Sequence, residues 1–293
     1  MSGKTIFTGN SEQKSTHKSQ IHRELNPRPP IKWAGGKSQL IARFKDFFPA
    51  NFDLYIEPFL GGGAVFFHLL PLNAVLIDNN EELINLYQVI RDDLEKLLSS
   101  LEEHQNTAEY FYKIRALNPQ QLAKIERASR FLYLNKTAYN GLYRVNKQNK
   151  FNVPFGYYQK PRIKDEENLR QVQYALKNAA IILGDFTLAL HYAKKAAFVY
   201  LDPPYQPLSK TANFTGYTSE GFDEDSQVRL AKLFYQLDKE GCLVMLSNSD
   251  TPFIRNLYEN YFIDEVFARR SVNSKADKRG AISELLIRNY QER

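Results

Sequence analysis

Short apolar runs that favour β-strands alternate with longer stretches of helical periodicity along most of the chain. The five clearest strand candidates are Leu54–Glu57, Ala74–Asp78, Ala180–Gly184, Ala197–Asp202 and Cys242–Ser247. Several of them are apolar at consecutive positions, as strands covered on both faces are. Two later runs, Phe262–Arg269 and Glu284–Asn289, alternate more and predict a closing antiparallel hairpin. The pattern therefore predicts a doubly wound α/β sheet.

About a hundred residues separate the second and third predicted strands, which is too many for one crossover. Apolar positions from Leu83 to Leu97 predict a helix, and two more helices are predicted at Phe111–Leu117 and Ile125–Leu134. The segment Leu142–Pro154, with a polar turn at Lys147-Gln148-Asn149, resembles a β-hairpin. We expect three parts: a polar mobile tail (1–30), a sheet domain (31–84 plus 175–293) and a largely helical inserted domain (85–174).

The charge is concentrated in one segment. The chain has a net charge of +6, but Tyr110–Asp165 alone carries 12 Lys and Arg against two acids, a net +10. Such a segment predicts either a docking face for a polyanion or a solvated basic surface, and charge alone leaves both open. No apolar run approaches the roughly 20 residues of a membrane span. Cys242 is the only cysteine, which suits a reducing cytoplasm.

The most specific motif is Asp202-Pro203-Pro204-Tyr205, at the end of an apolar strand. Ligands of open α/β sheets bind at the carboxyl ends of strands. The Asp202 carboxylate and the Pro203 carbonyl, whose backbone is stiffened by proline, can both accept hydrogen bonds from an exocyclic amine. These bonds would free the nitrogen lone pair for attack, and Tyr205 offers a flat face to a base rotated out of a helix. The alternative is an Asp-Pro turn that closes the strand.

Several other residues form a candidate nucleotide-cofactor site. Glu57-Pro58-Phe59-Leu60-Gly61-Gly62-Gly63 follows the first strand, where glycines let a ligand approach the backbone. Asp78 ends the second strand and can accept hydrogen bonds from a ribose or cap the next helix. Trp33, between Lys32 and Lys37, fits a binding edge or the core. Asp185 and Phe186 end the third strand and suit an adenine amine and ring.

With these motifs in view, the chain resembles the Dam family of DNA adenine methylases, the D12 class with GATC as target. The match runs from Ile31 to Tyr290 in the family's order. Its motifs here are Lys32-Trp-Ala-Gly-Gly-Lys, Glu57-Pro-Phe-Leu-Gly-Gly-Gly, Ile77-Asp-Asn-Asn, Tyr139-Asn-Gly-Leu-Tyr-Arg, Phe151-Asn-Val-Pro-Phe-Gly, Asp202-Pro-Pro-Tyr and Thr211-Ala-Asn-Phe-Thr-Gly-Tyr. The resemblance implies a Rossmann-like class I methyltransferase sheet whose inserted, mainly helical domain recognises the target and carries the β-hairpin.

The resemblance also implies an activity: transfer of a methyl group from S-adenosyl-L-methionine to N6 of adenine in double-stranded DNA. We expect Asp202 to Tyr205 to be the catalytic motif. Cofactor contacts are expected at Trp33, Lys37, Phe59, Gly61, Asp78, Asp185, Phe186 and Asp202. DNA contacts are expected at Lys32, Tyr139, Asn140, Leu142, Arg144 and Pro154. Arg144 suits a guanine edge, with a phosphate contact as the alternative, and Tyr139 suits insertion into the base stack.

The basic stretch from Arg269 to Arg279 is expected to contact phosphates or to form a surface loop. The five histidines are scattered, so no metal site is expected. We expect a cytoplasmic monomer, away from membranes, that acts alone or beside a restriction nuclease. Rival functions are methylation of an amine in RNA, in protein glutamine or at cytosine N4, and a catalytically silent DNA-binding module. A nicotinamide oxidoreductase is a further rival, although the Gly-x-Gly-x-x-Gly spacing is absent.

Overall fold

The computed structural model describes residues 25–33, 35–37, 41–146, 148, 150–207, 222–268 and 282–291. Several sequence predictions fall outside these residues, namely the first 24 residues of the tail, the motif Thr211–Tyr217, the basic stretch Arg269–Arg279 and the positions Ala34, Lys147 and Asn149.

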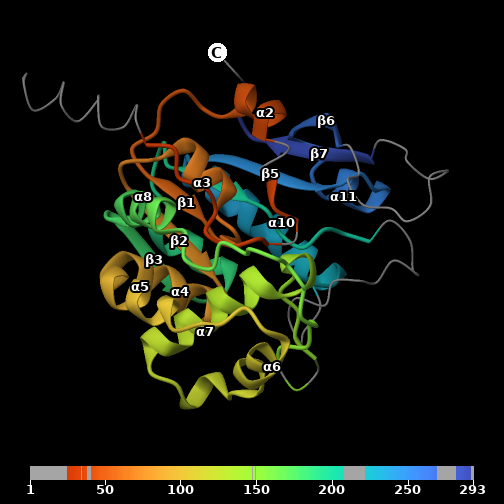
Figure 1. Ribbon diagram of the computed structural model, residues 1–293. Helices are drawn as coiled ribbons and strands as arrows, with labels where there is room; N and C mark the ends of the chain where they lie inside the picture. The colour runs from red at the N-terminus through yellow and green to blue at the C-terminus, as the bar shows by residue number, and fades with distance from the viewer. Residues whose placement is uncertain are drawn as a thin grey trace, which may run out of the picture.

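Within the described residues one sheet of seven strands runs in the order β3-β2-β1-β4-β5-β7-β6 (Figure 1). The first five strands are parallel, and β7 lies antiparallel between β5 and β6. Their bounds are β1 Tyr55–Glu57, β2 Ala74–Asp78, β3 Ala179–Leu183, β4 Phe198–Leu201, β5 Leu243–Ser249, β6 Phe262–Ala268 and β7 Ile282–Arg288. The predicted α/β fold and its closing antiparallel hairpin are confirmed.

The central strands are buried because both faces of the sheet are covered. In β1, Tyr55 packs into one core cluster and Ile56 into another on the opposite face. In β4, Tyr200 belongs to the first cluster and Val199 to the second. All four side chains are fully buried, which explains why these strands read as continuous apolar runs.

The helices form two layers around the sheet (Figure 1). The first cluster includes the apolar faces of α3, α4, α5, α6, α7 and α8, and the second includes those of α9, α10 and α11. Their bounds are α2 Ile41–Phe44, α3 Ala64–Leu69, α4 Glu81–Asp92, α5 Leu94–Glu102, α6 Ala108–Ala116, α7 Lys124–Thr137, α8 Glu166–Leu176, α9 Ala189–Tyr192, α10 Glu224–Lys239 and α11 Pro252–Leu257. Short 3₁₀ turns are η2 Lys45–Phe47, η3 Pro119–Gln121, η4 Tyr139–Gly141 and η5 Phe186–Leu188.

The structure departs from the sequence prediction in two places of the insertion. The predicted helix through Leu97 is two helices, because Asp93 leaves the helical region at φ −134° and ψ 35° and separates α4 from α5. The predicted hairpin is held by isolated antiparallel bridges, Val145 with Phe151 and Ala138 with Phe155, rather than by extended strands. The division of the chain into domains stays a prediction.

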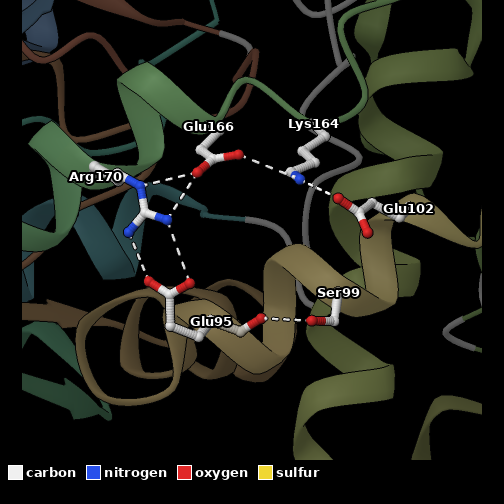
Figure 2. A network of polar contacts seen from close by, with 6 residues as sticks. All are labelled: Glu95, Ser99, Glu102, Lys164, Glu166 and Arg170. Atoms are coloured by element: carbon white, nitrogen blue, oxygen red, sulfur yellow. Dashed lines mark hydrogen bonds and ion pairs between the residues drawn. The ribbon is translucent and has the colours of Figure 1, made fainter.

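Ion pairs tie α8, which leads into β3, to α5 (Figure 2). Arg170 on α8 contacts Glu95 on α5 at 2.6 Å and Glu166 one turn earlier at 2.7 Å. Lys164 pairs with both Glu102 and Glu166. These side chains are largely exposed, so the network orients the two helices more than it stabilises them.

The last residues of the predicted tail have partners in the fold. Arg28 donates its main-chain N–H to Oδ1 of Asn168 on α8 at 2.8 Å, and its carbonyl accepts from Nδ2 of Asn168 at 3.0 Å. Asn26 donates to Gln171 on the same helix at 2.9 Å. This segment therefore leads along α8 into Lys32 and the residues that follow.

Candidate active site and nucleic-acid interface

Asp202 lies at the carboxyl end of β4 with two donors on one of its oxygens. Lys37 Nζ contacts Oδ1 at 2.8 Å, and Ser247 of β5 donates its hydroxyl to the same atom at 2.7 Å. The Lys37 side chain is 5% exposed and that of Asp202 is 19% exposed. The nearly buried ammonium is therefore compensated by a carboxylate that still reaches solvent on one side.

Lys37 also contacts the other end of the motif. Its Nζ donates to the Gly35 carbonyl at 2.9 Å and lies 4.5 Å from the centroid of the Tyr205 ring, a cation–π distance. The Tyr205 hydroxyl donates to Glu284 of β7 at 2.8 Å. Burial raises the pKa of Glu284, and the charge of Lys37 opposes that rise. Lys37 thus holds both Asp202 and the ring of Tyr205.

The chain after the two prolines is fixed by buried amides. Gln227 of α10 donates to the Pro204 carbonyl at 3.0 Å, and it accepts from Asn248 Nδ2 at 3.0 Å. Asn248 Oδ1 accepts from the Gln206 N–H at 3.1 Å, and Ser249 donates to the Gln206 carbonyl at 2.6 Å. Gln227 and Asn248 are fully buried, so this loop is held on both sides by satisfied polar groups.

Asp78 connects the ends of three neighbouring segments. Its carboxylate accepts from the Gly61 N–H and the Asn80 N–H, both at 2.9 Å, and its carbonyl accepts from Gly184 at 3.0 Å. Burial raises the pKa of Asp78, while the main-chain N–H groups oppose the rise. Asn80, not Asp78, caps α4 by accepting from Leu83 at 3.0 Å. The carboxylate of Asp78 is therefore left to the glycine turn and to the cavity beside it.

An aromatic cluster stands next to Asp78. The rings of Phe59 and Phe186 stack with centroids 5.2 Å apart, and Phe222 meets Phe59 edge-on at 5.8 Å. The guanidinium of Arg229 lies 5.0 Å from the Phe186 centroid and pairs with Asp185 at 3.1 Å. Two of the predicted cofactor residues, Asp185 and Phe186, are thus connected by one arginine of α10.

A cavity of about 1230 Å³ joins these features to the insertion. Its wall on the sheet side includes the five predicted site residues Phe59, Asp78, Asp185, Phe186 and Pro204. Its opposite wall comes from the hairpin and α6–α7, including Tyr112, Arg115, Arg130, Tyr143, Asn146, Gln148, Lys150 and Asn152. The volume exceeds the roughly 300–1,000 Å³ of an ordinary small-molecule site, so the cavity can hold more than one group.

The residues predicted to contact DNA lie together at the start and end of the hairpin. Tyr139 donates its N–H to the Pro154 carbonyl at 2.9 Å, which brings the two ends together. Arg144 Nε donates to Asn152 across the hairpin at 2.8 Å. Asn140 has a positive φ of 56°, which turns the chain sharply there. The side chains left exposed are Tyr139, Asn140, Leu142, Arg144 and Pro154.

Asn135 of α7 joins Lys32 to this turn. Its Oδ1 accepts from the Lys32 N–H at 2.9 Å, and its Nδ2 donates to the carbonyls of Lys32 at 2.8 Å and Gly141 at 3.1 Å. A Cβ at Gly141 would lie 2.5 Å from Lys32 Cδ, so glycine lets the lysine side chain cross the turn. Lys32 itself is exposed and lies with the predicted DNA-contacting residues.

Trp33 lies between the sheet and the insertion. Its ring stacks on Tyr143 with centroids 5.4 Å apart and faces Gly61, where a Cβ would lie 2.7 Å from Trp33 Cδ1. Trp33 and Gly61 are in contact with each other but do not line the cavity, and neither do Lys37 and Asp202. Their roles as cofactor contacts stay predictions.

The sequence alone does not reveal the polar residues that support the site, namely the buried Asn135, Gln227, Ser247 and Asn248 and the half-buried Glu284. Only the polar end of the apolar run at Ser247-Asn248-Ser249 offered a signal. Among the described residues there is no cluster of three His, Cys, Asp or Glu side chains able to hold a metal. The described helices also include none with the length and apolar character of a membrane span.

The sheet is doubly wound, with β7 antiparallel between β5 and β6, and a cavity lies at the carboxyl ends of its strands. These features define a Rossmann-like enzyme with a site suited to a nucleotide-like cofactor. Residues 33–272 match the model of the D12 class N6 adenine-specific DNA methyltransferases. The chain belongs to this family, and it is an adenine-specific DNA methyltransferase. Its family implies S-adenosylmethionine as the methyl donor and DNA as the substrate. The nicotinamide oxidoreductase and the silent binding module are thereby set aside.

Three relatives match this chain over nearly their whole length. The type II methyltransferase M.MjaIII of Methanocaldococcus jannaschii is 43% identical over 91% of this chain and 100% of its own. The type II methyltransferase M1.LlaDCHI of Lactococcus lactis subsp. cremoris is 43% identical over 91% of this chain and 97% of its own. The DNA adenine methylase of Escherichia coli strain K12 is 36% identical over 87% of this chain and 93% of its own.

Proposed function

We propose that the enzyme methylates N6 of adenine within GATC in double-stranded DNA, after the adenine rotates out of the helix into the cavity beside Asp202 to Tyr205. The observation that carries this proposal is the continuity of the cavity. One wall holds Phe59, Asp78 and Pro204, and the other is the hairpin that bears Arg144. Pro204 brings the catalytic motif to one wall, and Tyr143 and Asn152 bring the hairpin to the other, so a base delivered beside the hairpin would enter next to the motif.

The described residues fit S-adenosylmethionine on the sheet side of the cavity. Each Asp78 oxygen accepts one main-chain N–H and retains a lone pair for a ribose hydroxyl. The stacked rings of Phe59 and Phe186 offer an apolar edge for an adenine ring, and Asp185 lies beside them. When bound, the cofactor supplies an electrophilic methyl group on a sulfonium sulfur.

The Asp202 motif is suited to prepare the amino nitrogen of a rotated adenine. One oxygen of Asp202 is held by Lys37 and Ser247, which leaves the other as an acceptor for an N6 proton. Among the described residues no protein donor contacts the Pro203 carbonyl, whereas the Pro204 carbonyl is taken by Gln227. Pro203 can therefore accept the second N6 proton. Two such acceptors localise the lone pair on the nitrogen, and the carboxylate can take up the proton released after transfer.

The chemical step is tested with Asp202→Ala and Asp202→Asn in a methyl-transfer assay on a GATC duplex. We expect both variants to lose at least roughly 100-fold in rate while retaining most of their duplex affinity, because the lost interaction forms at the transition state. Scrambled duplex and RNA of the same length are the substrate controls. Full activity of Asp202→Ala would refute the mechanism, and equal methylation of the scrambled duplex would refute the GATC assignment.

Arg144 tests the reading of the target sequence. Arg144→Ala should lose about 1–3 kcal/mol of discrimination at one base pair, as expected when an arginine pairs with a guanine edge. Lys150→Ala is the matched control, since Lys150 is another exposed cation of the same hairpin. It should weaken all duplexes alike. Uniform weakening by Arg144→Ala would make Arg144 a phosphate contact.

A further inference from the structure

The two donors that reach Asp202 share a single oxygen. Lys37 Nζ lies 2.8 Å and Ser247 Oγ 2.7 Å from Oδ1, and within the described part of the chain no donor contacts Oδ2. The donors come from different elements, the segment before α2 and the end of β5. Two fixed donors on one oxygen set the plane of a carboxylate, whereas one donor leaves it free to rotate about that contact.

A second hydroxyl lies behind Ser247. Tyr200 of β4 places its OH 3.2 Å from Ser247 Oγ, and both side chains are fully buried. A serine hydroxyl has one proton, and Ser247 gives that proton to Asp202, because a carboxylate can only accept. The Tyr200 OH must then be the donor to Ser247. The chain of hydrogen bonds therefore has one direction, from Tyr200 through Ser247 to Asp202, and each bond polarises the next.

Burial and the charge of Asp202 make this direction stable. Burial raises the pKa of Tyr200 well above its usual value, and the negative charge of Asp202 raises it further, so the Tyr200 hydroxyl keeps its proton. The negative charge of Asp202 therefore helps to keep the Tyr200 hydroxyl protonated, and this hydroxyl is the first donor of the hydrogen-bond series that ends at Asp202.

We propose that Ser247 is a positioning residue for methyl transfer, with Tyr200 as its support. By occupying Oδ1 together with Lys37, Ser247 holds the Asp202 carboxylate so that Oδ2 faces the amino group of the rotated adenine. This inference rests on the proposed role of Asp202. It differs from a purely structural role, in which Ser247 would only satisfy the buried Tyr200 hydroxyl and its loss would lower stability without a selective effect on the transfer step.

The test compares Ser247→Ala with Ser129→Ala, which truncates another buried serine. Ser129 lies on α7, far from Asp202 in the chain, and its hydroxyl contacts the ring of His104. We expect Ser247→Ala to lower the single-turnover rate roughly 10- to 100-fold, because the Asp202 carboxylate loses a charge-assisted hydrogen bond. KM for the duplex and for S-adenosylmethionine should change less than about threefold. Ser129→Ala should keep the rate. Ser247→Thr, which retains the hydroxyl, should recover most of the loss.

Tyr200→Phe supplies an independent readout that does not depend on how well position 247 tolerates substitution. It should lower the rate by a few fold in the wild-type background and have no further effect in Ser247→Ala, because its influence passes through the serine hydroxyl. Equal effects in both backgrounds would overturn the relay. An unchanged rate in Ser247→Ala, with Asp202→Ala inactive, would overturn the positioning role alone. An active Asp202→Ala would instead refute the proposed function beneath it.

Discussion

Replacing Asn135 by alanine removes three hydrogen bonds that join Lys32 to the turn Tyr139–Gly141. Asn135 is 1% exposed, so water cannot replace the lost partner without local opening. The chain offers a matched control in Asn168, 5% exposed, which binds the N–H and carbonyl of Arg28 in the same way at 2.8 and 3.0 Å. The two amides differ in that Asn135 alone also holds the carbonyl of Gly141.

The magnitudes follow from the number of main-chain groups left without a partner. Each unsatisfied buried group costs about 1–3 kcal/mol, and partial exposure lowers this toward the smaller value. We expect Asn168→Ala to lower the free energy of unfolding by about 1–3 kcal/mol and Asn135→Ala by about 2–4 kcal/mol. Asn135→Ala also releases two segments: the turn that carries Tyr139 and Asn140, and Lys32, whose side chain crosses that turn.

Two measurements separate stability from recognition. Urea unfolding gives the stability change of each variant, and fluorescence anisotropy with a GATC duplex and a scrambled duplex gives affinity and discrimination. Asn135→Ala should bind the GATC duplex roughly tenfold more weakly and discriminate less, because ordering the turn then costs binding free energy. Asn168→Ala should stay within about twofold of wild type. If both variants lost stability and neither lost discrimination, Asn135 would be only a structural amide and the reasoning would fail.

Two further predictions concern stability. Burial lowers the pKa of His104 to about 4, so an unfolded chain takes up a proton below pH 6.5 that the folded chain refuses. Stability should therefore fall between about pH 6.5 and 4, by about 1–2 kcal/mol because the ring is partly exposed, and urea unfolding of His104→Gln should show a flatter pH dependence. A Cβ at Gly156 would lie 2.9 Å from the carbonyl oxygens of Thr137 and Ala138, so Gly156→Ala should cost about 1–3 kcal/mol and weaken duplex binding. An unchanged melting temperature in that variant would contradict the close approach.

Much of the fold follows from local patterns because burial on both faces demands consecutive apolar residues in the strands and one apolar stripe in the helices. The parallel strands were located to within a few residues for this reason, and the motifs at Asp78 and Asp202 fall at strand ends as expected. The helix boundary at Asp93 was missed because the apolar period continues across it, and the break is a matter of backbone direction. The hairpin was recognised by its turn, although its pairing is reduced to bridges.

The class of fold, the family and the motifs that carry the candidate chemistry can be predicted from the amino-acid sequence, since they depend on neighbouring residues and on fixed residue types. The contacts between distant groups come from the folded chain: Lys37 and Ser247 on one oxygen of Asp202, Glu284 on Tyr205, and Asn135 between Lys32 and Gly141. A buried serine or asparagine looks like any polar residue in the sequence. Its role arises from strand order and packing, which bring a particular donor to a particular acceptor.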